Sequence, residues 1–138
     1  MEMQSSWAGG CYCGAVRYQA GGPVSSRTLC HCESCRSIAG APCVAWFTVP
    51  LAAFRYTQGA PQRFQSSPGV TRCFCGRCGA HLSYESARDP GFIDVTTCSL
   101  DDPEALPPRD HTQVEGQLGW LHLADGLPRY PRSRPGPD

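Results

Sequence analysis

The chain has no net charge, since its 12 basic residues are balanced by 12 acidic ones. An excess of basic residues is what draws a protein to nucleic acid or to an anionic membrane, so the composition predicts neither partner. The longest apolar stretch, residues 43–54, is interrupted by Thr48 and Pro50 and is too short to span a bilayer. The first ten residues lack the cationic start and apolar run of a secretory signal. We therefore expect a soluble, cytoplasmic protein.

Long helical patterns are also scarce. Most of the apolar residues fall in short stretches that are rich in β-branched and aromatic side chains and are separated by Gly, Pro or Ser. One or two helical turns are predicted at 33–40, and a capped turn at 99–106. The spacing predicts a mainly β fold with little helix, a sheet folded over itself with metal sites at its corners. The expected strands lie at 15–20, 43–49, 54–57, 62–66, 71–74, 81–85 and 92–98.

The length of 138 residues is typical of one domain, and no internal repeat of fixed period occurs. From Leu127 onward the sequence contains four prolines and three arginines without an apolar pattern. We therefore place a single domain at 1–130 and expect a disordered tail at 131–138.

Ten cysteines are present, and most stand in closely spaced groups. In a protein without an export signal, such cysteines favour metal binding over disulfides. Two cysteines that are one or two residues apart bridge each other only with strain, but both can reach one ion. The three groups are Cys11 and Cys13; Cys30, Cys32 and Cys35; and Cys73, Cys75 and Cys78.

A tetrahedral zinc site takes four protein ligands when it is structural, and three with one open position when it is catalytic. The glycines in "CYCG" and "CGRCG" suit loops whose backbone N–H groups turn toward thiolates. Pairing the first group with Cys75 and Cys78 gives a closed four-cysteine site. The Cys30, Cys32 and Cys35 group is then left with an open position. Cys73 could compete with Cys75 as a ligand, although it reads better as a strand residue beside the site.

The other notable residues have ordinary structural interpretations. Cys43 and Cys98 are expected to be small buried residues. His31 stands between two ligands, so its side chain should point away from a metal held by both. Of the other histidines, which are expected on strands or at the surface, His111 ranks first as a residue that could approach the three-cysteine site. Trp46 and Trp120 are expected in the core. The remaining histidines are His81 and His122.

The order of the motifs "GGCYCGAVRY", "CHCESCR", "FQSSPGVTRCFCGRCGAHL" and "DVTTCSLDDP" resembles the glutathione-dependent formaldehyde-activating enzyme family, which includes relatives of centromere protein V. The resemblance runs over about residues 7–130. It implies an Mss4-like, or β-tent, fold with two zinc ions per chain. It also implies structural zinc at Cys11, Cys13, Cys75 and Cys78, and catalytic zinc at Cys30, Cys32 and Cys35.

The resemblance further implies a carbon–sulfur lyase that reversibly adds glutathione to formaldehyde. The expected partners are thus a small thiol such as glutathione and a small aldehyde. Three thiolates favour a soft sulfur as the fourth zinc ligand, so a substrate thiol, or water in its absence, is expected there. Arg36 follows the three cysteines and is a candidate catalytic residue, either pairing with a substrate carboxylate or donating to a thiolate; a solvated surface role is the alternative. Ser66, Ser67 and Arg72 flank the second metal-binding loop.

Two other functions compete with the enzyme. A non-catalytic zinc module would use its metals in place of a large core and bind another macromolecule. A thiol-redox protein would use Cys32 and Cys35, but no βαβ pattern surrounds that pair and Cys30 would have no role. A site with only three cysteines favours the enzyme over the module, because a structural site is expected to close.

Overall fold

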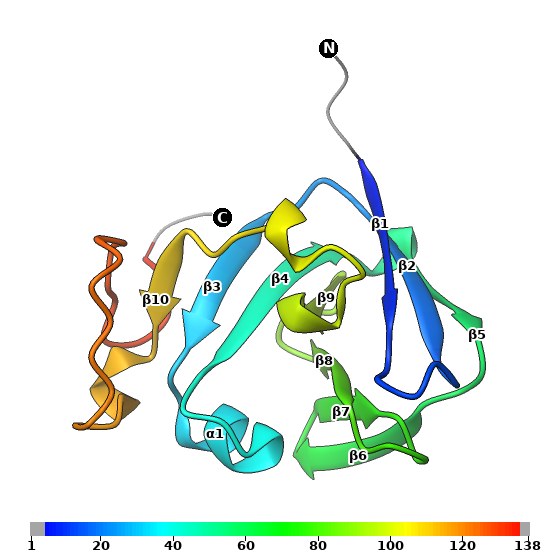
Figure 1. The fold of residues 1–138 in the computed structure, drawn as a ribbon, viewed down its shortest axis with the longest axis horizontal. Coiled ribbons are helices and arrows are strands. Elements are labelled where there is room, and N and C mark those ends of the chain that lie inside the picture. Colours follow the sequence, from blue (N-terminus) through cyan, green and yellow to red (C-terminus); the bar gives the residue numbers. More distant parts are fainter. Residues whose placement is uncertain (1–4, 136–138) are drawn as a thin grey trace.

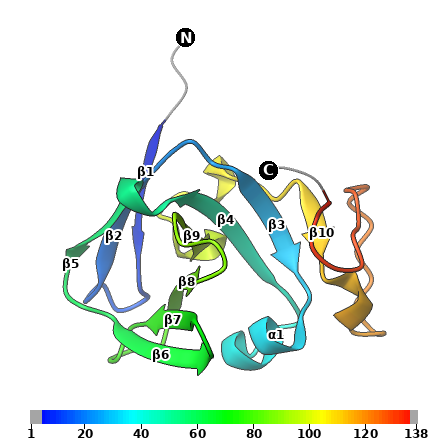
Figure 2. The same cartoon turned by 180° about the vertical axis from the view of Figure 1, so that it is seen from behind.

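The protein is described by a computed structural model that covers residues 5–135 and is built mainly from strands in two sheets (Figure 1). The smaller sheet has three antiparallel strands in the order β1–β2–β5. Both views place it at the end of the molecule farthest from β10 (Figure 2). Its strands are β1 (Ser6–Gly10), β2 (Arg17–Gly21) and β5 (Phe54–Gln58).

The larger sheet has seven strands in the order β10–β3–β4–β9–β8–β7–β6. All neighbouring pairs are antiparallel except β10 and β3, which run parallel at one edge. The strands curve across the molecule, so that α1 and the β6–β7 hairpin come near each other at one end (Figures 1 and 2). The bounds are β3 (Ser26–Cys30), β4 (Val44–Pro50), β6 (Gln62–Ser67), β7 (Val70–Phe74), β8 (His81–Ser86), β9 (Phe92–Thr96) and β10 (Asp110–Thr112).

The core is formed by strand residues of both sheets. Tyr18 and Ala20 alternate along β2 and are both buried, while exposed Gln19 lies between them. The same alternation of apolar and polar residues made β2 recognisable in the sequence. The tyrosine hydroxyl is hydrogen-bonded to Ser99 Oγ at 2.6 Å, which satisfies its only buried polar group. The main cluster also contains Val16, Phe47, Val49, Leu82, Ile93, Val95, Leu100 and Leu106.

The single α-helix of the described residues, α1 (Glu33–Ala39), is short. Cys32 caps its N-terminus by accepting a hydrogen bond from the Cys35 amide. Gly40 ends it in the left-handed conformation, with φ of 61°, where a residue without Cβ is favoured. Four 3₁₀ turns complete the secondary structure of residues 5–135: η1 (Leu51–Ala53), η2 (Thr97–Ser99), η3 (Pro103–Ala105) and η4 (Val114–Gly116).

The prediction of a mainly β fold is confirmed, and all seven predicted strands and the helix are present. The strand predicted at 92–98 ends at Thr96, because η2 follows directly. The capped turn at 99–106 contains η3, which Asp102 caps by accepting from the Glu104 amide. Three strands were not predicted. β1 ends in two glycines, β3 is mostly polar, and β10 has only three residues, so none has a strand-like apolar pattern.

The chain after η4 returns to the β10 edge of the larger sheet. His111 pairs with it through two backbone hydrogen bonds, to Pro128 and from Tyr130, each of 2.9 Å. Arg134 forms an ion pair of 2.8 Å with Asp110. The tail expected at 131–138 begins within this segment; residues 131–135 lie beside the sheet, and 136–138 lie outside the described residues. Within residues 5–135 there is no helix that is long and apolar enough to cross a membrane.

Candidate metal centres and cavity

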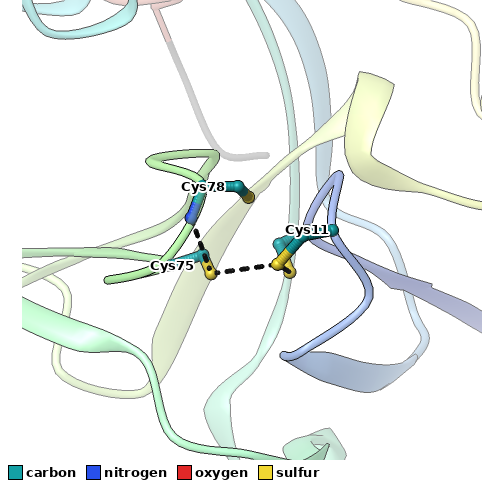
Figure 3. A group of neighbouring side chains, drawn as sticks. Cys11, Cys75 and Cys78 are labelled. Carbon is teal, nitrogen blue, oxygen red and sulfur yellow. Dashed lines mark hydrogen bonds between the residues drawn. The ribbon is translucent and has the colours of Figure 1, made fainter.

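Four cysteines from two distant loops come together where the two sheets meet. Cys11 and Cys13 belong to the loop after β1, and Cys75 and Cys78 to the loop after β7. Their sulfur atoms all lie within 4.8 Å of one another. Figure 3 shows the side chains of Cys11, Cys75 and Cys78 turned toward a common point. These are the four residues that the sequence analysis assigns to the closed site.

Each of these loops is a tight turn that directs backbone N–H groups at a sulfur. In the first loop the Val16 amide donates to Cys11 Sγ at 3.2 Å. In the second, the amides of Arg77 and Cys78 donate to Cys75 Sγ at 3.3 and 3.4 Å. The glycines that follow the last cysteine of each loop, Gly14 and Gly79, have φ near +80°. Such turns need glycine, and the donated hydrogen bonds stabilise thiolates.

The spacing of the sulfur atoms suits a metal rather than a disulfide. Cys13 Sγ lies 3.6 Å from Cys11 Sγ and 3.7 Å from Cys75 Sγ. A disulfide would bring two sulfurs to about 2.05 Å. Zinc–sulfur bonds of about 2.3 Å in a tetrahedron place the sulfurs about 3.8 Å apart. These two sulfur–sulfur separations therefore match a tetrahedral edge, and the donor set fits zinc.

The second cluster is local in sequence. Cys30 ends β3, Cys32 caps α1 and Cys35 lies in its first turn, so the strand-to-helix turn brings three sulfurs within 4.8 Å. The Cys35 amide donates to Cys32 Sγ at 3.4 Å. Cys30 and Cys35 are buried and Cys32 is half-buried. No fourth cysteine, histidine or carboxylate of the described residues joins this cluster.

Electrostatic interactions within each cluster favour at least one thiolate. Hydrogen bonds from Cys30 and Cys35 lower the pKa of Cys32 to about 2. Hydrogen bonds with Cys32 and Cys35, together with burial, raise the pKa of Cys30. In the other cluster, backbone hydrogen bonds from Ala80 and Cys13 lower the pKa of Cys78 to about 6. Since thiolate is the form that binds metal, both clusters have the required chemistry.

A cavity of about 820 Å³ adjoins the three-cysteine cluster but not the four-cysteine cluster. Its walls come from α1, from β3 and β4, and from the β6–β7–β8 side of the larger sheet. Trp46 and Tyr84 pack against the three cysteines and also line it. The volume is near the upper end of the roughly 300–1,000 Å³ of small-molecule sites. The three sulfurs thus border a space large enough for a substrate.

Arg72, on β7, is the site residue to which sequence reasoning gave no role. Its Nη1 and Nη2 atoms both lie 3.9 Å from Cys35 Sγ, and its guanidinium stacks 4.9 Å from the Tyr84 ring centroid. The side chain is 5% exposed and, within residues 5–135, forms no ion pair with a carboxylate. A buried cation needs a nearby anion, and the cysteine sulfurs are the anions at hand. The sequence did contain a signal for this role, because Arg72 is an arginine inside an apolar strand, three residues before Cys75.

Arg36, the candidate catalytic residue, contacts the backbone of the segment that carries the cysteines. Its Nε donates to the backbone oxygen of His31 at 3.3 Å, and it is absent from the walls of the cavity. The helix directs the Arg36 side chain back toward the preceding loop, whereas Arg72 approaches from the opposite strand. The sulfur contact proposed for Arg36 is therefore made by Arg72.

The histidines near the clusters are buried and bonded to one another. His31 does point away from the sulfurs, as predicted, and its Nε2 lies 2.9 Å from Nδ1 of His111. His111 Nε2 lies 2.8 Å from a carboxylate oxygen of Asp125. His111 is a strand residue of β10, as expected for the other histidines, and it pairs with His31 rather than joining the three-cysteine cluster.

The outcomes for the remaining residues are mixed. Cys73 is a fully buried strand residue outside both clusters, as the preferred interpretation held. Trp46 is buried as predicted, but Trp120 is 69% exposed because it lies in the loop segment beyond η4. Cys98 is also exposed, contrary to prediction, since β9 has already ended before it; Cys43 is half-buried.

Comparisons with known proteins agree with this architecture. The family model described as "Glutathione-dependent formaldehyde-activating enzyme" matches residues 6–115. A protein of Halomonas elongata named as a putative enzyme of that kind is 30% identical over 125 residues, covering 83% of this chain and 79% of its own. An uncharacterized lyase of Schizosaccharomyces pombe is 30% identical over 98 residues, covering 64% of this chain and 66% of its own.

A solved structure has the same fold. A crystal structure of a Rhodobacter sphaeroides protein superimposes with a TM-score of 0.56 at 20% identity, covering 89% of this chain and 98% of that one. The fold and the two cysteine clusters define a mainly β enzyme with two sites that could hold metal ions. The chain belongs to the glutathione-dependent formaldehyde-activating enzyme family.

Proposed function

We propose that the protein is a zinc-dependent carbon–sulfur lyase that reversibly adds a small thiol to formaldehyde or another small aldehyde. Zinc would be held at both clusters, two ions per chain, with Cys11, Cys13, Cys75 and Cys78 serving structure. Cys30, Cys32 and Cys35 would hold the catalytic ion. Glutathione, which the family description names, is the first thiol to test. The reaction would take place in the cytoplasm, where thiols stay reduced.

The observation that carries this proposal is the different surroundings of the two clusters. One has four sulfurs and lies away from the cavity, whereas the other has three sulfurs and borders it. A tetrahedral ion on three thiolates has one position for a small ligand, and a soft site prefers sulfur there. That position would face the space where the second reactant binds.

The reaction itself needs a thiolate, a polarised carbonyl and a proton. The thiol sulfur forms a bond to the carbonyl carbon, the carbonyl π pair moves to oxygen, and oxygen takes up the proton that the thiol lost. Bound zinc supplies a lowered thiol pKa. Arg72 adds positive charge beside Cys35, which offsets the negative charge of the thiolates and favours a further anionic sulfur nearby. Trp46 and Tyr84, which line the cavity, would hold the thiol and the aldehyde next to each other.

Cobalt-substituted protein provides the test. A thiol that enters the three-cysteine site changes its charge-transfer and d–d bands, and added formaldehyde should change the thiol-bound spectrum. Exchange spectroscopy by NMR would then report whether the thiol–formaldehyde adduct forms and breaks faster than without protein. Cys32→Ser is the control, because it removes one ligand of this site and leaves the other cluster whole. If neither thiol nor aldehyde alters the spectrum, the proposed reaction is wrong.

A further inference from the structure

The charges along the cavity favour one class of thiol over another. Three carboxylates line it: Glu33 of α1, Asp89 of the β8–β9 turn and Asp94 of β9. Among residues 5–135, the two cations that line it already have partners. Arg72 faces Cys35, and Arg134 is paired at 2.8 Å with Asp110 and donates to Ser26. A three-thiolate zinc site would itself carry a negative charge. The field inside the cavity is therefore negative.

A negative cavity is unfavourable for glutathione. That tripeptide carries two carboxylates and one ammonium, so it enters with a net negative charge. Its carboxylates would lose water without gaining an unpaired cation of the cavity wall. A thiol with neutral groups avoids this cost, and a thiol with an ammonium group gains from the same carboxylates.

Apolar side chains at the cavity add a second preference. Ile38 of α1, Phe64 of β6 and Phe92 of β9 all line it and are 41%, 56% and 44% exposed. Single exposed apolar residues are ordinary, but these three come from separate elements to one cavity. Together with Trp46 they would cover an apolar group of a bound molecule.

We infer that this site takes a neutral or ammonium-bearing thiol with an apolar portion in preference to an anionic thiol such as glutathione. The inference rests on the proposed function, because it assumes that the thiol binds at the three-cysteine cluster. The inference goes beyond the proposed function because it names which thiols bind well.

Matched thiols test the charge preference. Glutathione and its diethyl ester share the same reactive group and skeleton but differ in their two carboxylates, and cysteamine carries only an ammonium. In cobalt-substituted protein at low salt, we expect the ester to bind on the order of tenfold more tightly than glutathione. The difference in affinity between glutathione and its ester should decrease in 0.5 M salt, where charges more than about 4 Å apart are largely screened.

Paired variants assign the effect to the cavity. Asp89→Asn removes a carboxylate that lines the cavity, and Glu104→Gln removes an exposed one from η3, outside it. Asp89→Asn should reduce the ratio of ester affinity to glutathione affinity about two- to threefold. Glu104→Gln should leave this ratio unchanged. Phe64→Ala should weaken binding of benzyl mercaptan several-fold without altering 2-mercaptoethanol.

The outcomes separate this inference from the proposed function. Glutathione that binds as tightly as its ester would overturn the inference, while thiol binding at the site would still support the reaction. Equal effects of Asp89→Asn and Glu104→Gln would also overturn it. If no thiol of the series perturbs the cobalt spectrum, both the inference and the proposed reaction are wrong.

Discussion

His31 and His111 are joined by a 2.9 Å hydrogen bond between Nε2 and Nδ1, deep in the protein and 80 residues apart in sequence. The Asp125 carboxylate accepts from His111 Nε2, so Nδ1 of His111 carries the lone pair and accepts from His31. Burial lowers the pKa of His31, which keeps its ring neutral. This chain of bonds fixes the residue between Cys30 and Cys32 from behind.

The Asp125–His111–His31 hydrogen-bond chain should therefore slow the loss of metal from the three-cysteine site. Asp125→Ala removes the acceptor at its outer end, and we expect metal to leave this site up to about tenfold faster. Asp125→Asn keeps an oxygen acceptor and should stay close to the parent. Transfer of cobalt to a chelator, followed at each site's own bands, measures both rates. Equal loss from both clusters would mean that Asp125 acts on general stability instead.

The two clusters should differ in what their loss does to the fold. Cys78→Ser breaks a site that ties together loops 62 residues apart, as measured from Cys13 to Cys75, and should unfold the domain. Structural zinc contributes on the order of 10 kcal/mol to folding in small metal-dependent domains. Cys32→Ser alters a local turn and should leave a folded protein with one metal ion per chain.

Metal analysis and thermal unfolding check this difference. The parent, purified without added zinc, should contain two zinc ions per chain. Equal melting of Cys32→Ser and Cys78→Ser would contradict the assignment of roles, and a single equivalent in the parent would contradict the two-site interpretation.

Arg72 should tune the electron density of the Cys35 sulfur. Arg72→Gln removes a cation 3.9 Å from that atom, which makes the thiolate easier to oxidise. We expect the sulfur-to-cobalt charge-transfer band of the three-cysteine site to move to lower energy. Arg63→Gln is the matched control, because Arg63 contacts the sulfur of Cys73, at 3.7 Å, which belongs to neither cluster. An identical spectrum for Arg72→Gln and the parent would show that the arginine does not act on Cys35.

His81 should make stability depend on pH below neutrality. Burial, with Arg72 nearby, lowers the pKa of His81 to about 4 from an ordinary value near 6.5. Between these values the unfolded chain binds a proton that the folded protein does not, so stability falls as pH drops through 6.5 and levels off below 4. At pH 5.5 the loss is roughly 1 kcal/mol.

His81→Phe tests that dependence while keeping the edge-on contact with Trp46. Urea unfolding of parent and variant is measured at pH 7 and pH 5.5. Because acid acts on the cysteines of both proteins alike, the difference between the two proteins reports His81 alone. The free energy of unfolding should drop less in the variant. The same drop in both proteins would assign the acid sensitivity to the thiols.

The sequence allowed the cysteine clusters and most strands to be predicted because both depend on local signals. Cysteine spacing and the following glycines carry the loop geometry, and apolar alternation carries the strands. What could not be predicted depends on contacts across the chain. Asp110–Thr112 forms a strand only because β3 offers a parallel edge. Arg72 reaches Cys35 only because β7 and α1 face each other across the cavity.

The placement of β10 has a consequence for how the protein is made. Its partner β3 leaves the ribosome long before it, and the 80 residues between His31 and His111 take roughly 4 to 16 s to synthesise at about 5–20 residues per second. During that interval Cys30, Cys32 and Cys35 already exist as a ligand set, but the buried histidine and the edge strand that will brace them do not. The first metal ion or oxidant to reach these thiols therefore meets a turn that the histidine pair and the edge strand do not yet hold in place.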